Sequence, residues 1–132
     1  MATDERRARR EQVVREHMES ENRQEFDATL RTFSHPRYEL IPTGQVFDGV
    51  DEVSKYYADS RAIVPDQRNE LIALHHADDV VIVEFWLRGT PSGRPFECRM
   101  CAMFFFDDDD LMTCERVYYD AATIANQVSG AA

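Results

Sequence analysis

A single carboxylate near the C-terminus occupies a position where it could do proton chemistry. Asp120 follows the aromatic stretch 116–119 and precedes the short apolar run 121–127. This order predicts a strand that ends at Asp120 and a helix that begins there. If the strand walls an apolar pocket, burial raises the pKa of a carboxyl at its rim and suits it to acid/base catalysis. The alternative is a helix N-cap, which accepts hydrogen bonds from free backbone N–H groups.

Four tyrosines are candidates to hold a negatively charged oxygen beside that carboxylate. A buried phenol can donate a hydrogen bond to an enolate oxygen, although tyrosine more often packs its ring and leaves its hydroxyl at a polar boundary. We predict catalytic positions for Tyr38 and Tyr118, and ligand-binding positions for Tyr57 and Tyr119.

Histidine titrates near neutral pH and is the other acid/base candidate. His75 and His76 are neighbours in a predicted strand, so they point to opposite faces and at most one of them faces inward. His75 is the catalytic candidate, and a strand-end histidine in solvent or at a subunit contact is the alternative. The histidines and aspartates show no ligand spacing, so we expect no metal and no other cofactor. The Asp107–Asp110 run is expected to be a solvated hairpin tip.

The elements that must position these residues follow from hydrophobic periodicity. The predicted helices span about 4–18, 20–34, 50–63 and 120–127. The predicted strands span about 38–41, with a break at 42–44 and a brief continuation at 46–47, and then 70–76, 80–88, 96–106 and 111–119. Helices followed by a meander of strands indicate an α+β fold. We expect a curved antiparallel sheet that wraps as a cone around three helices, with a small-molecule pocket inside.

Alternation within the strands assigns side chains to the two faces of this sheet. Phe85 in strand 80–88, and Met100 and Phe104 in strand 96–106, fall on faces that are predicted to look inward. We therefore expect these three residues to contact a hydrophobic small molecule.

The outer face of the predicted sheet is also apolar. It carries Trp86, Met103 and Phe105, and a sheet that is apolar on both faces is covered on both. Helices cover one face, and a second copy of the chain is the simplest cover for the other, so we predict a homodimer. Glu84 is assigned to this interface. An inward-facing Glu84 would instead be a buried acid and a catalytic candidate.

Composition narrows the class of protein. The 132 residues predict one domain over 1–132, with a core at about 10–127. A net charge of −10 repels phosphate backbones, so we expect no nucleic-acid partner. The Arg-rich segment 6–10 lies among acidic residues and predicts a solvated helix face. No apolar run is long enough for a membrane span, and three cysteines in apolar strands suggest reduced thiols and a cytoplasmic protein without a membrane partner.

Several short segments, taken in order, indicate a family. They are Asp48-Gly49, Pro91–Arg94, Phe104–Asp107 and Glu115–Asp120 with Gln127 beyond. This organisation resembles the nuclear transport factor 2-like superfamily and, within it, the SnoaL-like polyketide cyclases. The resemblance implies a cofactor-free enzyme that cyclises, isomerises or dehydrates a hydrophobic molecule, with Asp120 as the acid/base. The superfamily also hosts proteins without chemistry, so a non-catalytic ligand-binding or dimerisation module is the alternative.

A second enzymatic branch, the limonene-epoxide-hydrolase-like proteins, can be compared residue by residue. The positions that match its paired Arg and Asp are Val83 and Phe85, and the position that matches its second Asp is Val117. The polar groups of that reaction are therefore missing, and we do not expect epoxide hydrolysis.

Overall fold

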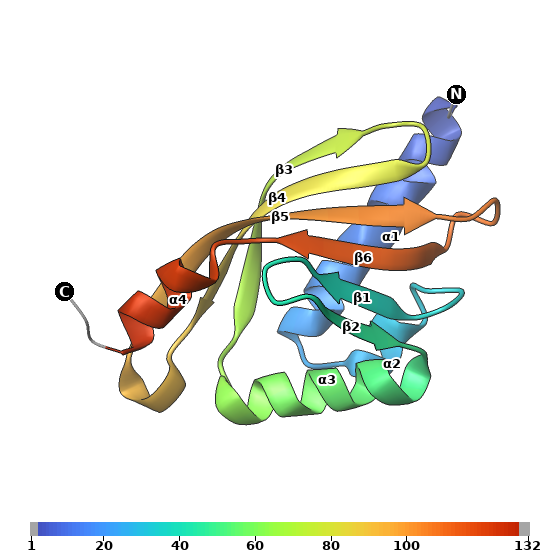
Figure 1. The fold of residues 1–132 in the computed structure, drawn as a ribbon. Coiled ribbons are helices and arrows are strands. Elements are labelled where there is room, and N and C mark those ends of the chain that lie inside the picture. The colour runs from blue at the N-terminus through green and yellow to red at the C-terminus, as the bar shows by residue number, and fades with distance from the viewer. Residues whose placement is uncertain (1–2, 130–132) are drawn as a thin grey trace.

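The computed structural model describes residues 3–129, which form four α-helices and one six-stranded sheet (Figure 1). The ends of the predicted domain, residues 1–2 and 130–132, lie outside the described residues. The helices are α1 (Asp4–Asn22), α2 (Phe26–Leu30), α3 (Val50–Ile63) and α4 (Ala121–Val128), and a short 3-10 helix, η1, spans Pro91–Gly93. Thr3 caps α1 by accepting a hydrogen bond from the Arg6 backbone N–H at 3.1 Å.

The strands are β1 (Arg37–Leu40), β2 (Gln45–Asp48), β3 (Arg68–His76), β4 (Val80–Gly89), β5 (Phe96–Phe106) and β6 (Met112–Tyr118). Their order in the sheet is β2-β1-β6-β5-β4-β3. β3 to β6 form the predicted antiparallel meander, which confirms the α+β fold class.

One strand pair differs from the expected all-antiparallel sheet. β1 pairs with β6 in parallel, and Tyr38 lies opposite Glu115 in this register. A four-residue strand carries no local signal that selects its partner, so the sequence does not predict this pairing. Its consequence is that the N-terminal half of the chain is placed beside the last strand.

The core lies between the sheet and the helices, with α1 crossing one face of the sheet (Figure 1). The buried positions of α1 include Val14, His17 and Met18, spaced three and four residues apart so that they form one stripe. The inward faces of β4 and β5 contribute Val81, Val83, Phe85, Met100, Ala102 and Phe104, as the alternation predicts. A histidine therefore stands in the middle of an apolar stripe and points toward the sheet.

The N-terminal arginines and the hairpin aspartates differ from prediction. Asp110 is buried and forms ion pairs with Arg6, Arg9 and Arg10 at 3.1, 2.8 and 3.0 Å. Arg10 is itself buried and also donates to the Asp78 carbonyl at 2.8 Å. The expected solvated hairpin tip and solvated helix face are both wrong at these positions, because the two charged segments lie together and neutralise each other.

On the outer face of the sheet, Trp86, Met103 and Phe105 are half-buried. The guanidinium groups of Arg88 and Arg99 lie 5.1 and 5.7 Å from the Trp86 ring centroid. Glu84 points to this face, as predicted, and pairs with Arg99 at 2.7 Å. Within residues 3–129, no helix combines the length and the apolar character that a membrane crossing requires.

Candidate functional site

A cavity of about 130 Å³ lies inside the curved sheet. This is close to the roughly 150 Å³ of an apolar protein cavity that binds benzene. Its apolar lining consists of Met18, Leu40, Tyr56, Phe85, Leu87, Met100, Phe104, Val117, Tyr119 and Ile124. Its polar lining consists of His17, Glu21, Tyr38, Arg61, Gln67, Asn69 and Glu115. The cavity therefore combines apolar walls with a concentrated polar group.

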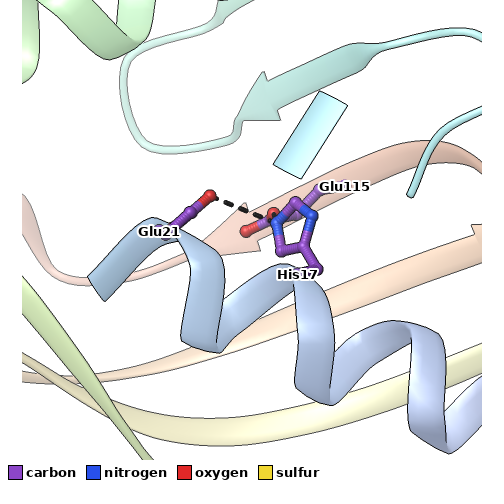
Figure 2. Close-up of side chains that lie close together, drawn as sticks. All are labelled: His17, Glu21 and Glu115. Carbon is purple, nitrogen blue, oxygen red and sulfur yellow. Dashed lines mark hydrogen bonds and ion pairs between the residues drawn. The ribbon is translucent and has the colours of Figure 1, made fainter. Parts of the chain in front are cut away.

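The centre of the polar group is His17, which lies between two carboxylates (Figure 2). Its Nε2 is 2.8 Å from Glu115 Oε1 on β6 and 3.2 Å from Glu21 Oε1, one turn further along α1. The side chain of His17 is 1% exposed and that of Glu115 is 9% exposed. The rings of Phe33 and Phe104 meet the imidazole edge-on, with centroids 5.4 and 5.3 Å away. These aromatic contacts and the helix hold the imidazole in one orientation.

Neighbouring hydroxyls determine which nitrogen of His17 carries a proton. His17 Nδ1 lies 3.0 Å from Thr32 Oγ1. The hydroxyl of Thr32 donates its only hydrogen to the Thr29 carbonyl, at 2.5 Å. Thr32 Oγ1 must then accept from His17, so Nδ1 carries a hydrogen. The remaining nitrogen, Nε2, faces the carboxylates and is the one that can exchange a proton with a ligand.

The charges of this cluster shift one another's pKa values. Burial opposes the charged form of His17, but Glu21 and Glu115 outweigh it and raise the pKa of His17 to about 9. Burial would likewise raise the pKa of Glu21, yet His17 and Arg61 lower it. For Glu115, burial prevails over the hydrogen bond from His17 and raises the pKa. At neutral pH, His17 is therefore an imidazolium, and it lies between Glu21, whose carboxyl has a lowered pKa, and Glu115, whose carboxyl has a raised pKa and is the more basic of the two.

Two tyrosine hydroxyls extend the cluster in one direction. Tyr38 donates to Glu21 Oε1 at 2.7 Å, and its oxygen lies 2.6 Å from the Tyr57 hydroxyl. Because the Tyr38 hydrogen is directed to Glu21, Tyr57 must be the donor to Tyr38. Burial, with Glu21 nearby, raises the pKa of both phenols above the usual value of 10. Both hydroxyls thus stay protonated, with Tyr57 donating to Tyr38 and Tyr38 donating to Glu21.

One predicted catalytic residue, Tyr38, and most of the predicted ligand-binding residues lie at this cavity. Tyr38, Phe85, Met100, Phe104 and Tyr119 line it. Tyr57 is buried next to it, where it contacts Tyr38. The structure therefore brings together the tyrosine from the first strand and the inward faces of β4 and β5.

The other three predicted catalytic residues lie away from the cavity. Asp120 is exposed and caps α4: its Oδ1 accepts from the Ala122 backbone N–H and its Oδ2 from the Thr123 hydroxyl, both at 3.0 Å. The expected orientation of Asp120 toward the pocket is wrong, and the N-cap alternative describes it. Tyr118 is 41% exposed because Val117 takes the inward position of β6. His75 is exposed on β3, one of the two edge strands of the sheet.

His17, Glu21 and Glu115 were missed by the sequence prediction. Ending the first helix at residue 18 left Glu21 outside it, although Glu21 falls one turn after His17 and seven residues after Val14. Glu115 shares a strand face with Val117, two residues away, which is a usable signal for an inward carboxylate. Their convergence could not be read from sequence, because Glu115 is 98 residues from His17.

The same three residues are also the candidates for holding a metal. Their ligand atoms all lie within 4.8 Å of one another, and one imidazole with two carboxylates suits a borderline transition-metal ion. A metal would have to displace the proton of His17. It would also have to compete with Tyr38 and Arg61 for Glu21. The expectation of a metal-free site remains a prediction.

Comparison with known proteins assigns the family. The SnoaL-like domain model matches residues 14–114, so the chain belongs to the SnoaL-like family. No significant match to a curated protein is found.

Three solved structures illustrate the shared fold. A protein with a ketosteroid isomerase-like fold from Catenulispora acidiphila DSM 44928, in complex with trimethylamine, has a TM-score of 0.80 at 18% identity and covers 89% of this chain and 92% of its own. An NTF2-like protein from Burkholderia pseudomallei K96243 has a TM-score of 0.82 at 18% identity, with coverages of 92% and 98%. SalBIII, an epoxide hydrolase/cyclase-like enzyme in pyran ring formation in the polyether salinomycin, has a TM-score of 0.77 at 19% identity, with coverages of 91% and 95%.

Proposed function

We propose that the protein is a cofactor-free acid/base enzyme that cyclises, isomerises or dehydrates a small, largely apolar molecule. The observation that carries the proposal is the convergence of His17, Glu21, Glu115 and Tyr38 on one cavity whose remaining lining is mostly apolar. Burying ionisable groups is unfavourable, and a pocket that only stores an apolar ligand gains nothing from them. The cluster therefore favours an enzyme over a non-catalytic binding module of the same fold.

The geometry suggests a division of roles. Glu115, whose basicity is increased by burial, takes a proton from an activated C–H bond of the substrate. The His17 imidazolium donates a hydrogen bond from Nε2 to the oxygen on which negative charge develops, and Tyr38, whose hydrogen is directed to Glu21, holds that carboxylate in place. The proton is then returned to another carbon or to a leaving oxygen. Proton transfer of this kind is internally balanced, since no electrons enter or leave the substrate.

Proton exchange at carbon tests the proposal without knowledge of the natural substrate. We would measure deuterium incorporation at the α-carbons of cyclohexanone, 2-cyclohexenone and acetophenone in D₂O by NMR. The wild-type protein should accelerate exchange of at least one ketone over buffer. Replacing a general base should slow that exchange by about 100-fold or more, so Glu115→Gln should lose most of the acceleration.

Glu84→Gln is the matched control, because Glu84 carries the same functional group on the outer face of the sheet. It should exchange at the wild-type rate. If no ketone responds to the protein, or if Glu115→Gln is as fast as wild type, Glu115 is not a catalytic base and the binding-module alternative is preferred.

A further inference from the structure

The guanidinium of Arg61 has more hydrogen-bond donors than the described chain satisfies. Arg61 lies in the last turn of α3, and its side chain is 8% exposed. It donates from Nη1 to Ser60 Oγ at 2.9 Å, and its Nη2 is 3.8 Å from Glu21 Oε2, beyond hydrogen-bond distance. Its Nε–H is buried and has no acceptor among residues 3–129. Since arginine carries five N–H donors, most of them are left without a protein acceptor.

The surroundings of Arg61 leave the donor edge of the guanidinium available. Its central carbon lies 5.2 Å from the ring centroid of Phe26, so one face of the plane is covered by an aromatic ring. The N–H groups lie in the plane and point away from its faces, in the fork geometry that matches a carboxylate. Arg61 lines the cavity, so a ligand inside the cavity can approach the guanidinium group.

Gln67 supplies a second donor on the same cavity. Gln67 is half-buried and also belongs to the lining. Its backbone N–H donates to the Val64 carbonyl at 3.1 Å, whereas its side-chain amide makes no hydrogen bond to another described residue. Asn69, which also lines the cavity, is different, since its amide already donates to the Met18 carbonyl at 3.2 Å. Buried polar groups in proteins are almost always paired. The buried Arg61 Nε–H is an exception to this rule, and Gln67 adds an uncommitted side-chain amide to the lining of the same cavity.

We propose that Arg61, assisted by Gln67, binds a carboxylate of the substrate. The substrate class is then a small apolar carboxylic acid rather than a neutral hydrocarbon-like molecule. This inference rests on the proposed function, because it places the substrate carboxylate relative to His17 and Glu115, the proposed acid/base residues. Glu21 lies between the acid/base residues and Arg61: its Oε1 is 3.2 Å from His17 Nε2, and its Oε2 faces Arg61. The reacting carbon is then expected only a few bonds from the substrate carboxylate.

The alternative is that Arg61 serves only as a counter-ion for Glu21. The 3.8 Å separation and the unused donors argue against this reading, because Arg61 and Glu21 do not form the bidentate pair that arginine and carboxylate usually prefer. A counter-ion also predicts no preference among ligands, whereas a carboxylate subsite predicts a strong one.

Benzoate and benzamide separate the two readings, since they have nearly the same shape and differ in charge. Calorimetric titration of the wild-type protein at pH 7 should show benzoate binding at least tenfold more tightly than benzamide. Arg61→Gln should lose this preference and Arg61→Lys should keep part of it. Arg94→Gln removes the same charge from an exposed site outside the cavity lining and should bind both ligands as wild type does.

Two results would overturn the inference. One is equal binding of benzoate and benzamide by the wild type. The other is a loss of preference in Arg94→Gln as large as in Arg61→Gln, which would indicate nonspecific attraction. If Arg61→Gln does not fold, the wild-type protein alone can test the proposal. The ¹⁵N-edited NMR signal of the buried Arg61 Nε–H should shift when benzoate is added and should not shift with benzamide. A signal that does not move with benzoate would contradict the proposal.

The titration also separates this inference from the proposed function. Glu115→Gln should lose proton exchange and keep the benzoate preference, because Arg61 is unchanged. If proton exchange depends on Glu115 and benzoate shows no preference, only the carboxylate subsite is wrong. If benzoate is preferred but Glu115→Gln exchanges protons normally, only the acid/base roles are wrong.

Discussion

Tyr38 and Glu115 lie opposite each other in the parallel β1–β6 pair, and both reach the Nε2 atom of His17, at 3.1 and 2.8 Å. This strand pairing assembles the candidate site from three distant segments: α1, the short β1 and the final strand. The histidine thus bridges the helical layer and the sheet. Its protonation state should influence the stability of the whole domain as well as any proton chemistry.

The first prediction concerns pH and stability. His17 has its pKa raised from 6.5 to about 9, so its protonation stabilises the folded state fully below pH 6.5, and this contribution disappears as pH rises through 9. The raised pKa of Glu115 acts in the same direction, whereas the lowered pKa of Glu21 affects only acidic pH. Urea unfolding should therefore show stability falling between pH 6.5 and 9, by roughly 3 kcal/mol at most.

The matched variants for this prediction are His17→Gln and His75→Gln. The first removes the buried titrating group and should flatten the pH dependence over that interval. The second removes an exposed histidine and should follow the wild-type curve. Parallel curves for wild type and His17→Gln would show that His17 does not titrate with a raised pKa, and the ¹⁵N shifts of its imidazole would report this directly.

The second prediction concerns Asp120, whose carboxylate caps α4. Asp120→Ala should lower the free energy of unfolding by about 1 kcal/mol, the usual effect of losing an N-cap, whereas Asp120→Asn should be nearly neutral because asparagine caps equally well. Neither change should alter proton exchange, since Asp120 lies outside the cavity lining. Unfolding by urea and the ketone exchange assay measure the two effects. A large loss of proton exchange in Asp120→Asn would show that Asp120 takes part in catalysis.

The contrast between Asp120 and Glu115 shows what the sequence can and cannot predict. Helix and strand ranges, strand faces and several pocket-lining residues follow from periodicity, because burial on one face imposes a spacing of two or of three to four residues. The position of Asp120 at a strand end makes it a candidate base, but local backbone N–H groups compete for the same carboxylate. Which of these partners prevails depends on backbone geometry that no spacing encodes.

Glu115 and His17 are functional candidates that sequence patterns alone do not bring together. Each has a detectable local signal, since each shares a face with apolar neighbours, namely Val14 for His17 and Val117 for Glu115. The chemistry arises only when His17 on α1 meets Glu115 on β6, 98 residues away, beside Tyr38, which the unpredicted parallel pairing of β1 places opposite Glu115. The same long-range effect explains Asp110 and Arg10, which look like solvated charges in sequence and are buried partners 100 residues apart.

The third prediction concerns this buried ion pair. Burial opposes the ionised form of Asp110, but hydrogen bonds from Arg9 and Arg10 prevail and lower its pKa. Asp110→Asn keeps a residue that tolerates the positive φ of 59° at this position and removes the charge, leaving Arg10 buried without a counter-ion. We expect a loss of about 2–4 kcal/mol in urea unfolding. Asp108→Asn, at an exposed position of the same turn, should change stability little; an equal loss there would contradict the role of the pair.

The fourth prediction is a homodimer through the outer face of the sheet. Trp86, Met103 and Phe105 are only half-buried there, and intrachain pairs such as Glu84–Arg99 already neutralise neighbouring charges, so a second apolar face can cover them at little electrostatic penalty. Sedimentation equilibrium should give twice the mass of one chain for the wild type and the mass of a single chain for Met103→Glu. Ile63→Glu changes a highly exposed apolar residue on α3 and should stay dimeric. A wild-type protein that sediments as a monomer at micromolar concentration would rule out this interface. The intrachain contacts of arginines with the rings of Trp86 and Phe105 would then be the only cover of these aromatic residues among residues 3–129.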